Sequence, residues 1–239
     1  MTMIYTATSP HPALAPYIDA YWSVTGAGHG TVTNRILPDG CMDIIFNLGE
    51  DDRDMKSGKA YLVGTMTSSF DSIVYPGTLF LGIRFKPAAF AAFYKFSSLH
   101  ELTDCTVECG KGLAPDLSIL KDPVAGLNAY FLERLSTPKH VLFPILEDIQ
   151  RNNGQVRVRE LVKRHFITER QLERNFKYYT GVSPKEFINQ ERFRYALQAI
   201  RCKRPGEDLS DIAFACGYYD QAHLSNEIRK YTGDAPSQL

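Results

Sequence analysis

The sequence has few of the residues that mark secreted, membrane-bound or metal-binding proteins. It contains 5 Cys, 6 His and 1 Trp in 239 residues. So small and odd a number of cysteines argues against a disulfide framework and for a reducing cytoplasm. No stretch of about 18 apolar residues is present, so we expect no transmembrane helix. The N-terminus lacks a basic segment followed by an apolar one, so we expect no secretory signal.

Enzyme and metal-site signatures are missing as well. The sequence has no Gly-x-Ser-x-Gly, His-Glu-x-x-His, Walker or Rossmann motif, so we expect no enzyme. His11 and His29 stand in loops without a partner at ligand spacing, and we expect no cofactor and no metal site. Cys105 and Cys109, together with Cys41 beside a turn, keep one alternative open, a thiol- or metal-responsive protein.

The formal net charge of zero conceals an uneven distribution. Residues 1–149 hold 11 Lys and Arg against 16 Asp and Glu, whereas residues 150–239 hold 16 against 11. Such a contrast suggests two domains with different partners, and the basic one is a candidate for contact with phosphate backbones. We place the domains at residues 1–137 and 138–239.

A repeat occupies the basic part. Residues 177–184 read KYYTGVSP and residues 229–236 read RKYTGDAP, 52 positions later. The similarity extends upstream with an offset of 51, so the second copy holds one extra residue near Tyr219. The chain therefore contains two copies of one structural unit, unit one (residues 157–181) and unit two (residues 208–233).

Each unit reads as two short helices around a sharp turn. In unit one, RVRELVKRH precedes Thr168, which with Gln171 forms a capping box for the second helix. In unit two, DLSDIAFAC precedes Gly217, which suits a turn that needs a positive φ. Both second helices end at a glycine, Gly181 or Gly233, as many helices do. This pattern predicts two helix-turn-helix units.

The second helix of each unit has an apolar stripe, so its other side faces solvent or a partner. Leu172 and Phe176 in unit one, and Leu224 and Ile228 in unit two, recur at the spacing of a buried face. We expect both outer faces to be basic and to contact double-stranded DNA. The alternative is a pair of hairpins that dock protein. The candidate DNA-binding residues are Thr168, Arg170, Glu173, Arg174, Lys177, Asp220, Gln221, Ala222, Ser225, Asn226 and Arg229.

A third helix is predicted between the units. Ser183 as N-cap, Pro184 at the first helical position and Glu186 in the first turn indicate its start, and its pattern runs to Arg201. Eighteen residues of helix span about 27 Å. That length suits two reading helices held about one DNA turn apart, roughly 34 Å.

The C-terminal hundred residues resemble the AraC/XylS family of bacterial transcription regulators. The resemblance rests on TERQLERNFKYYTGVSPKEFINQERFRYALQAI and LSDIAFACGYYDQAHLSNEIRKYTGDAP. It implies that each second helix enters the major groove, and it makes RNA polymerase and a second copy of the chain candidate partners. It also implies base contacts from Arg170, Glu173, Arg174, Gln221, Ala222 and Ser225, with Asn226 near the backbone.

Four residues depart from the family pattern. Phe166 stands where the turn glycine is common, Val162 where a small alanine is usual, and Arg157 where a Ser or Thr cap is typical. These departures cluster in the first helix of unit one, so we expect a looser turn in that unit. Asn226 stands where many members carry Arg, which predicts a weaker phosphate grip in unit two.

The N-terminal part reads mainly as strands, so the expected fold class is α+β, with a barrel or sandwich ahead of an all-α domain. RILPDGCMDIIFN and LGIRFKP resemble a sensor domain found on some family members. Residues 79–86 alternate as a half-buried strand would. A helix is expected near 87–96, two helices near 116–136 and another over 139–153. A small-molecule effector would enter the barrel. Its candidate ligands are Trp22, Arg35, Asp43, Phe46 and Arg84.

An apolar stripe follows the predicted sensor domain. Leu120, Val124, Leu127, Phe131 and Leu135 recur every three or four residues. Packing against the chain's own barrel explains the stripe equally simply. The alternative is a helix pair between two protomers, so a homodimer is a candidate assembly.

Overall fold

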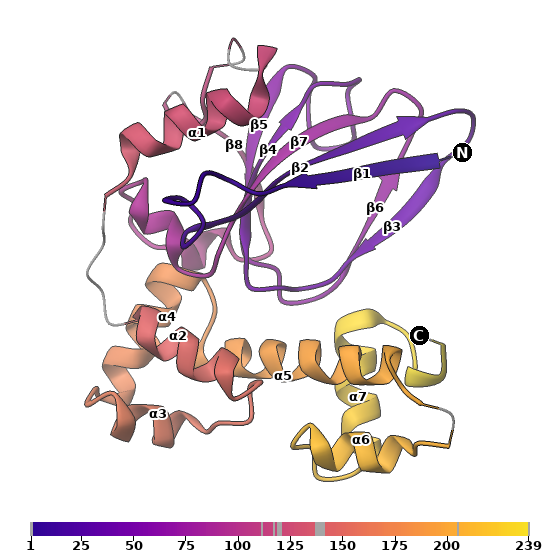
Figure 1. Ribbon diagram of the computed structural model, residues 1–239, viewed down its shortest axis with the longest axis vertical. Helices are drawn as coiled ribbons and strands as arrows, with labels where there is room; N and C mark the ends of the chain where they lie inside the picture. Colours follow the sequence, from indigo (N-terminus) through magenta and orange to yellow (C-terminus); the bar gives the residue numbers. More distant parts are fainter. Residues whose placement is uncertain are drawn as a thin grey trace.

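The chain folds into a strand-rich part above a helical part (Figure 1), which confirms the α+β expectation. The computed structural model describes residues 2–110, 112–116, 118, 121–136, 142–204 and 206–238. None of the helices in those ranges is long and apolar enough to cross a membrane. The boundary predicted between residues 137 and 138 lies outside the described residues. Below, "strand domain" means the described residues up to 136 and "helical domain" those from 142 onward.

Two antiparallel sheets make up the strand domain. The larger has the order β1-β2-β7-β4-β5-β8 and the smaller pairs β3 with β6. The strands are β1 Thr2–Thr8, β2 Ile18–Ala27, β3 Val32–Ile36, β4 Met42–Asn47, β5 Lys59–Val63, β6 Phe70–Val74, β7 Leu79–Phe85 and β8 Thr106–Glu108.

Strand β7 lies in the middle of the larger sheet and is covered on both faces. Residues 80–83 and Phe85 are buried, although the alternation had predicted burial on one face only. Leu81, Ile83 and Phe85 belong to the main core, while Phe80 belongs to a smaller cluster with Trp22 on the opposite face. The half-buried expectation was wrong because a second sheet, which the local pattern does not encode, covers the other side.

The helices of the strand domain are shorter than predicted. Residues 87–96 form only a 3-10 turn, η1 Ala89–Ala92, which follows Ala88 at φ 62°. A second turn, η2, spans Leu99–Leu102. Of the two helices expected near 116–136, the described residues contain one, α1, Pro123–Arg134. Asp122 caps it by accepting a hydrogen bond from the backbone N–H of Ala125 at 3.2 Å. The helix predicted at residues 87–96 does not form, because the burial of aromatic side chains, and not helical periodicity, sets the backbone conformation there.

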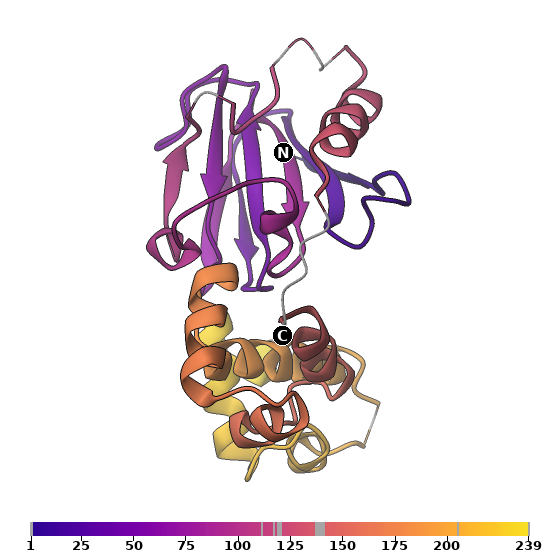
Figure 2. The same cartoon turned by 90° about the vertical axis from the view of Figure 1, so that its left-hand side faces the viewer.

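Helix α1 lies beside the strands (Figure 2), and its apolar stripe packs against the core of the strand domain itself. Leu127 and Phe131 are fully buried in the main core. The Phe131 ring meets those of Phe85 and Phe93 at centroid distances of 5.5 and 5.1 Å. A dimer seam through Phe131 is therefore ruled out, and packing within the chain is confirmed. Leu120, the first member of the stripe, lies outside the described residues.

The helical domain has the predicted order of elements. Its helices are α2 Leu142–Arg151, α3 Val158–Arg164, α4 Glu169–Thr180, α5 Pro184–Arg201, α6 Leu209–Ala215, α7 Gln221–Thr232 and the short η4 Pro236–Gln238. Helix α5 lies between the two units (Figure 1). Phe187 near its start packs in the core of unit one, and Phe193 further along packs in the core of unit two. One 18-residue helix thus joins two small cores.

Candidate DNA-binding surface and effector cavity

Both second helices begin and end as the sequence predicts. Thr168 Oγ1 accepts from the backbone N–H of Gln171 at 3.2 Å, and Gln171 Oε1 accepts from the N–H of Thr168 at 3.0 Å. In α7, Asp220 accepts from the N–H of His223 at 2.7 Å. The closing glycines, Gly181 and Gly233, have φ values of 85° and 79°, which favour glycine because it lacks a Cβ.

The turns differ by one residue, as the offset predicts. Residues 165–168 join α3 to α4, and residues 216–220 join α6 to α7. Gly217 has φ 75°, and its counterpart Phe166 has φ 51°. A positive φ strains a residue with a bulky side chain. Phe166 adopts it with its side chain 96% exposed, so no packing of that ring explains the conformation.

The candidate DNA-contacting side chains lie on the side of α4 and α7 away from the two cores. Those that are exposed are Thr168, Arg170, Arg174, Asp220, Gln221, Ala222, Asn226 and Arg229, and those that are half-buried are Glu173, Lys177 and Ser225. Lys177 Nζ pairs with Glu173 at 3.3 Å one turn away. These positions leave the first turns of both helices open to a partner.

The two units are not equally basic, which corrects the expectation of two basic outer faces. Residues 157–177 hold seven Arg and Lys against three Glu, but residues 208–229 hold one Arg against four acidic residues. The exposed face of α7 is mostly neutral and polar. Unit one is therefore the unit suited to phosphate contacts, whereas unit two offers amide and hydroxyl groups that suit base edges.

Arg157 and Val162, which depart from the family pattern at α3, are accommodated by local contacts. The backbone N–H of Arg157 donates to Glu160 Oε2 at 3.1 Å, and this bond stands in for a side-chain cap. Val162 is half-buried and packs against the core of unit one. Unit two has the better cap, because Asp208 accepts from the N–H of Ser210 at 3.3 Å.

The strand domain holds the C-terminal end of α4 through hydrogen bonds to its last carbonyls. Thr65 Oγ1 donates to the carbonyl of Thr180 at 2.7 Å. The carbonyl of Gly181 accepts from Thr103 Oγ1 at 2.8 Å and lies 2.7 Å from His100 Nδ1. These contacts satisfy helix-end carbonyls that have no partner within α4.

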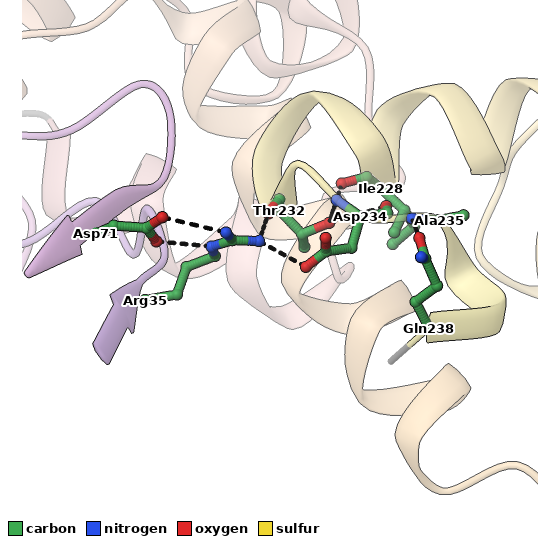
Figure 3. Close-up of polar contacts among 7 residues, drawn as sticks. All are labelled: Arg35, Asp71, Ile228, Thr232, Asp234, Ala235 and Gln238. Atoms are coloured by element: carbon green, nitrogen blue, oxygen red, sulfur yellow. Dashed lines mark hydrogen bonds and ion pairs between the residues drawn. The ribbon is translucent and has the colours of Figure 1, made fainter. Parts of the chain in front are cut away.

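The end of α7 is held at the same position of the repeat by one arginine (Figure 3). Arg35 of β3 donates from Nη1 to the carbonyl of Thr232 at 2.7 Å and also pairs with Asp234. Its Nε and Nη2 donate to Asp71 of β6 at 2.7 and 3.1 Å. Arg35 thus joins the small sheet to the C-terminal end of α7.

A cavity of about 1100 Å³ lies on the face of the large sheet opposite the main core, beside β3 and β6. Four of the five residues predicted to bind an effector line it, namely Trp22, Arg35, Asp43 and Arg84. Phe46 does not, because its ring is buried in the main core. Alternation along β4 puts Asp43 and Phe46 on opposite faces of the sheet.

Trp22, Asp43 and Arg84 form the polar centre of the cavity wall. Trp22 Nε1 donates to Asp43 Oδ1 at 2.6 Å. Arg84 Nε lies 3.6 Å from Asp43 and 3.7 Å from Asp39, and this buried atom has no hydrogen-bond partner among the residues that the structure describes. Burial raises the pKa of Asp43 to about 6, although Arg84 and the Trp22 N–H lower it.

Gly82 gives the Trp22 indole its place against the sheet. The two residues are paired between β2 and β7. A Cβ at position 82 would lie 2.0 Å from Trp22 Cε2. Gly82, Asp39 and Asp71 also shape this site, and none of them was among the residues predicted from the sequence. Only the turn Pro38-Asp39-Gly40 before β4 offered a local signal, and the others depend on strand pairing.

In the part of the chain that the structure describes, the cysteines form no disulfide and no metal site. All five are free thiols. Burial raises the pKa of Cys109 to about 12, and burial together with nearby carboxylates raises that of Cys41, so both remain thiols rather than reactive thiolates. Within the described residues, no group of three or more His, Cys, Asp or Glu side chains is placed to hold a metal ion.

Comparison with known proteins matches the two parts separately. A family described as a helix-turn-helix domain matches residues 161–239, and a domain of unknown function (DUF6597) matches residues 6–108. The HTH-type transcriptional activator RhaS of Pectobacterium carotovorum is 33% identical over 79 residues, which cover 33% of this chain and 28% of the relative. RhaS of Yersinia pestis is 28% identical over 99 residues, covering 41% and 36%.

The chain spans 28% and 36% of the length of these two curated relatives. Among solved structures, ToxT from Vibrio cholerae O395 aligns over 99% of this chain and 95% of its own, with 14% identity and a TM-score of 0.47. The helix-turn-helix match falls on the two units that the structure displays. The chain thus combines a double helix-turn-helix domain, which matches the helix-turn-helix family and is similar to transcriptional activators, with a strand-rich N-terminal domain that matches DUF6597.

Proposed function

We propose that the chain is a sequence-specific DNA-binding transcription regulator that is controlled by a small molecule in the strand domain. The observation that carries this proposal is the matched pair of helix-turn-helix units, each of which exposes the first turns of its second helix. The similarity to proteins named transcriptional activators supports it. Double-stranded DNA is the partner that such a pair of helices suits.

In this proposal α4 and α7 enter successive major grooves. Arg174 and Arg170 contact base edges or phosphates from α4, and Gln221 and Ser225 contact bases from α7. The uneven charge of the units assigns most of the salt-dependent affinity to unit one. RNA polymerase and a second copy of the chain are further candidate partners.

Selection of bound sequences from a random DNA library tests the proposal directly. We expect an enriched site with two elements about one helical turn apart. Arg174→Ala should weaken binding to that site by about 1–3 kcal/mol and change binding to random DNA much less. Arg134→Ala on α1, remote from both units, is the matched control. Equal losses on selected and random DNA would show that Arg174 contacts phosphate only.

A helical module that docks protein is the second candidate. The acidic balance of unit two favours it, because acidic residues repel a phosphate backbone. The two candidates differ in their response to salt. Binding to DNA should weaken steeply between 50 and 200 mM salt. Failure of the random library to enrich any sequence at low salt would favour docking to protein.

A further inference from the structure

The cavity of the strand domain has aromatic walls. Tyr5 and Trp22 line it from the large sheet and stack with ring centroids 6.4 Å apart at an interplanar angle of 26°. Phe80 of the large sheet and Phe70 of β6 contribute two further rings. Such walls bind flat or apolar bodies, and the faces of the rings attract cations.

The charged residues around the cavity are mainly acidic. Six lining residues are aspartates and three are arginines, and the described lining includes no lysine, histidine or glutamate. Within the described residues, Asp43 accepts a single hydrogen bond, from Trp22. The field inside the cavity therefore favours a positive ligand.

Two of the three arginines are already engaged by carboxylates of the protein. Arg35 is held by Asp71 and Asp234 (Figure 3). Arg84 lies between Asp43 and Asp39, so one guanidinium faces two carboxylates. The third, Arg53, sits on an exposed loop. An anionic ligand would lie close to these carboxylates, and it could not take the place of the arginines that pair with them. Bringing like charges together is unfavourable in a partly buried site.

We infer that this cavity binds an organic cation, a protonated amine or quaternary ammonium group carried on an apolar or aromatic body. The inference rests on the proposed function, in which the cavity is the effector site. The cationic group lies near Asp43 and Asp39, and the body lies against Trp22 and Tyr5. Cation–π attraction to the indole and charge pairing with Asp43 act on the same group.

Trp22 makes the test direct, because it is the only tryptophan in the chain and lines the cavity. The purified full chain is titrated at constant ionic strength with 2-phenylethylammonium, 2-phenylethanol and 3-phenylpropionate, which share one aromatic body. We expect the ammonium compound to change the Trp22 emission with saturation and to bind at least about tenfold more tightly than the other two. Tighter binding of the carboxylate, or equal binding of all three, overturns the inference.

Two variants locate the cation. Asp43→Asn keeps an oxygen acceptor for Trp22 and should remove the preference for the ammonium compound while leaving 2-phenylethanol binding unchanged. Glu133→Gln removes one carboxylate from α1, where that side chain is 81% exposed, and should leave the preference intact. An unchanged preference in Asp43→Asn overturns the assigned position. If Asp43→Asn does not fold, the wild-type ranking of the three compounds still decides the inference.

DNA binding, measured on the same preparation, separates this inference from the proposed function. If site-specific DNA binding is intact but the Trp22 emission does not respond to the ammonium compound at 10 mM, the cation inference alone is overturned. That concentration lies near the weak limit of about 1 mM to 10 mM expected for such fragments. Loss of site-specific DNA binding in every condition, with ammonium binding intact, overturns the proposed function instead.

Discussion

Arg35 and Thr232 are 197 positions apart in the sequence, yet Arg35 Nη1 lies 2.7 Å from the Thr232 carbonyl at the end of α7. The same guanidinium pairs with Asp71, which also lines the cavity. Unit one is held at the matching carbonyls by neutral side chains, among them Thr65 and Thr103. The strand domain therefore holds the ends of α4 and α7 through chemically different contacts.

We predict that Arg35→Ala loosens unit two and leaves unit one in place. The amides of residues 221–234 should exchange hydrogen faster in the variant, because the end of α7 loses its contact with β3. The amides of residues 169–181 should exchange as in the wild type. Hydrogen exchange read by mass spectrometry measures both, and Arg53→Ala is the control. Equal acceleration in both units would show that Arg35 supports the whole domain interface.

Asp43 should make the strand domain less stable as the pH rises. Its pKa in the folded chain is about 6 because burial disfavours the carboxylate, with Asp39 and Asp19 raising it and Arg84 lowering it. The unfolded chain has the ordinary value of about 3.9. Folding is therefore favoured with the proton bound. This contribution is complete below about pH 4 and is lost as the pH passes through 6, by about 3 kcal/mol in total.

Urea unfolding followed by Trp22 emission at pH 4.5 and 7.5 tests this contribution. In Asp43→Asn the titrating group is gone, so the free energy of unfolding should fall less between the two pH values than in the wild type. Asp51 and Asp71, whose pKa values are lowered by their hydrogen bonds, change stability in the opposite direction. The difference between the two proteins cancels that effect. Parallel pH profiles would mean that Asp43 is solvated.

Gly82→Ala should displace the Trp22 indole. The added methyl group would sit 2.0 Å from the ring, so the ring must move away from the sheet and from Asp43. We expect the free energy of unfolding to fall by about 1–3 kcal/mol and the Trp22 emission to shift. Gly110→Ala is the control, since nothing lies within 4 Å of a Cβ there. Unchanged emission in Gly82→Ala would contradict the close packing of the indole.

The elements that the sequence predicted well are those that depend on neighbours in the chain. The Thr168 cap, the Gly181 and Gly233 helix ends and the Pro184 helix start each rest on residues within one turn. The candidate effector site depended on strand parity and pairing. Parity explains why Phe46 lies in the core although Asp43, three residues earlier, lines the cavity.

Other features needed the tertiary structure. The pairing of Arg35 with Asp71 and Asp234 spans two domains, and no local pattern announces it. The one-sided burial predicted for β7 failed because the β3–β6 sheet covers its second face. The uneven charge of the two units was present in the sequence. A sum over residues 150–239 conceals it, whereas a count over each unit shows it.

Phe131→Ala tests the packing of α1 against the strand domain. Phe131 is fully buried among aromatic rings, and its truncation leaves a cavity. We expect a loss of about 3–5 kcal/mol in the free energy of unfolding, measured by urea unfolding with Trp22 emission. Leu132→Ala, at a neighbouring position that is 37% exposed, should change stability little. A Phe131→Ala variant as stable as the wild type would contradict the packing of this ring in the core.

Phe166 offers a test in which a substitution should stabilise the chain. Its φ of 51° places a bulky residue in the left-handed region, at a cost of about 1–2 kcal/mol. Its ring is 96% exposed, so little packing is lost on removal. Phe166→Gly should raise the free energy of unfolding of the helical domain by about 1 kcal/mol, after the greater freedom of glycine in the unfolded chain is subtracted. Phe166→Val, which introduces a β-branched side chain at the same φ, should lower it.

Thermal unfolding followed by far-UV circular dichroism measures both Phe166 variants, because the helical domain supplies most of the helix. DNA affinity on a selected site then shows whether the exposed ring has a second role. If Phe166→Gly is more stable but binds the site more weakly, the ring contacts DNA from the turn of unit one, and the strain is retained for that contact. If affinity is unchanged, Phe166 only occupies the turn. A less stable Phe166→Gly variant would contradict the strain assigned to this position.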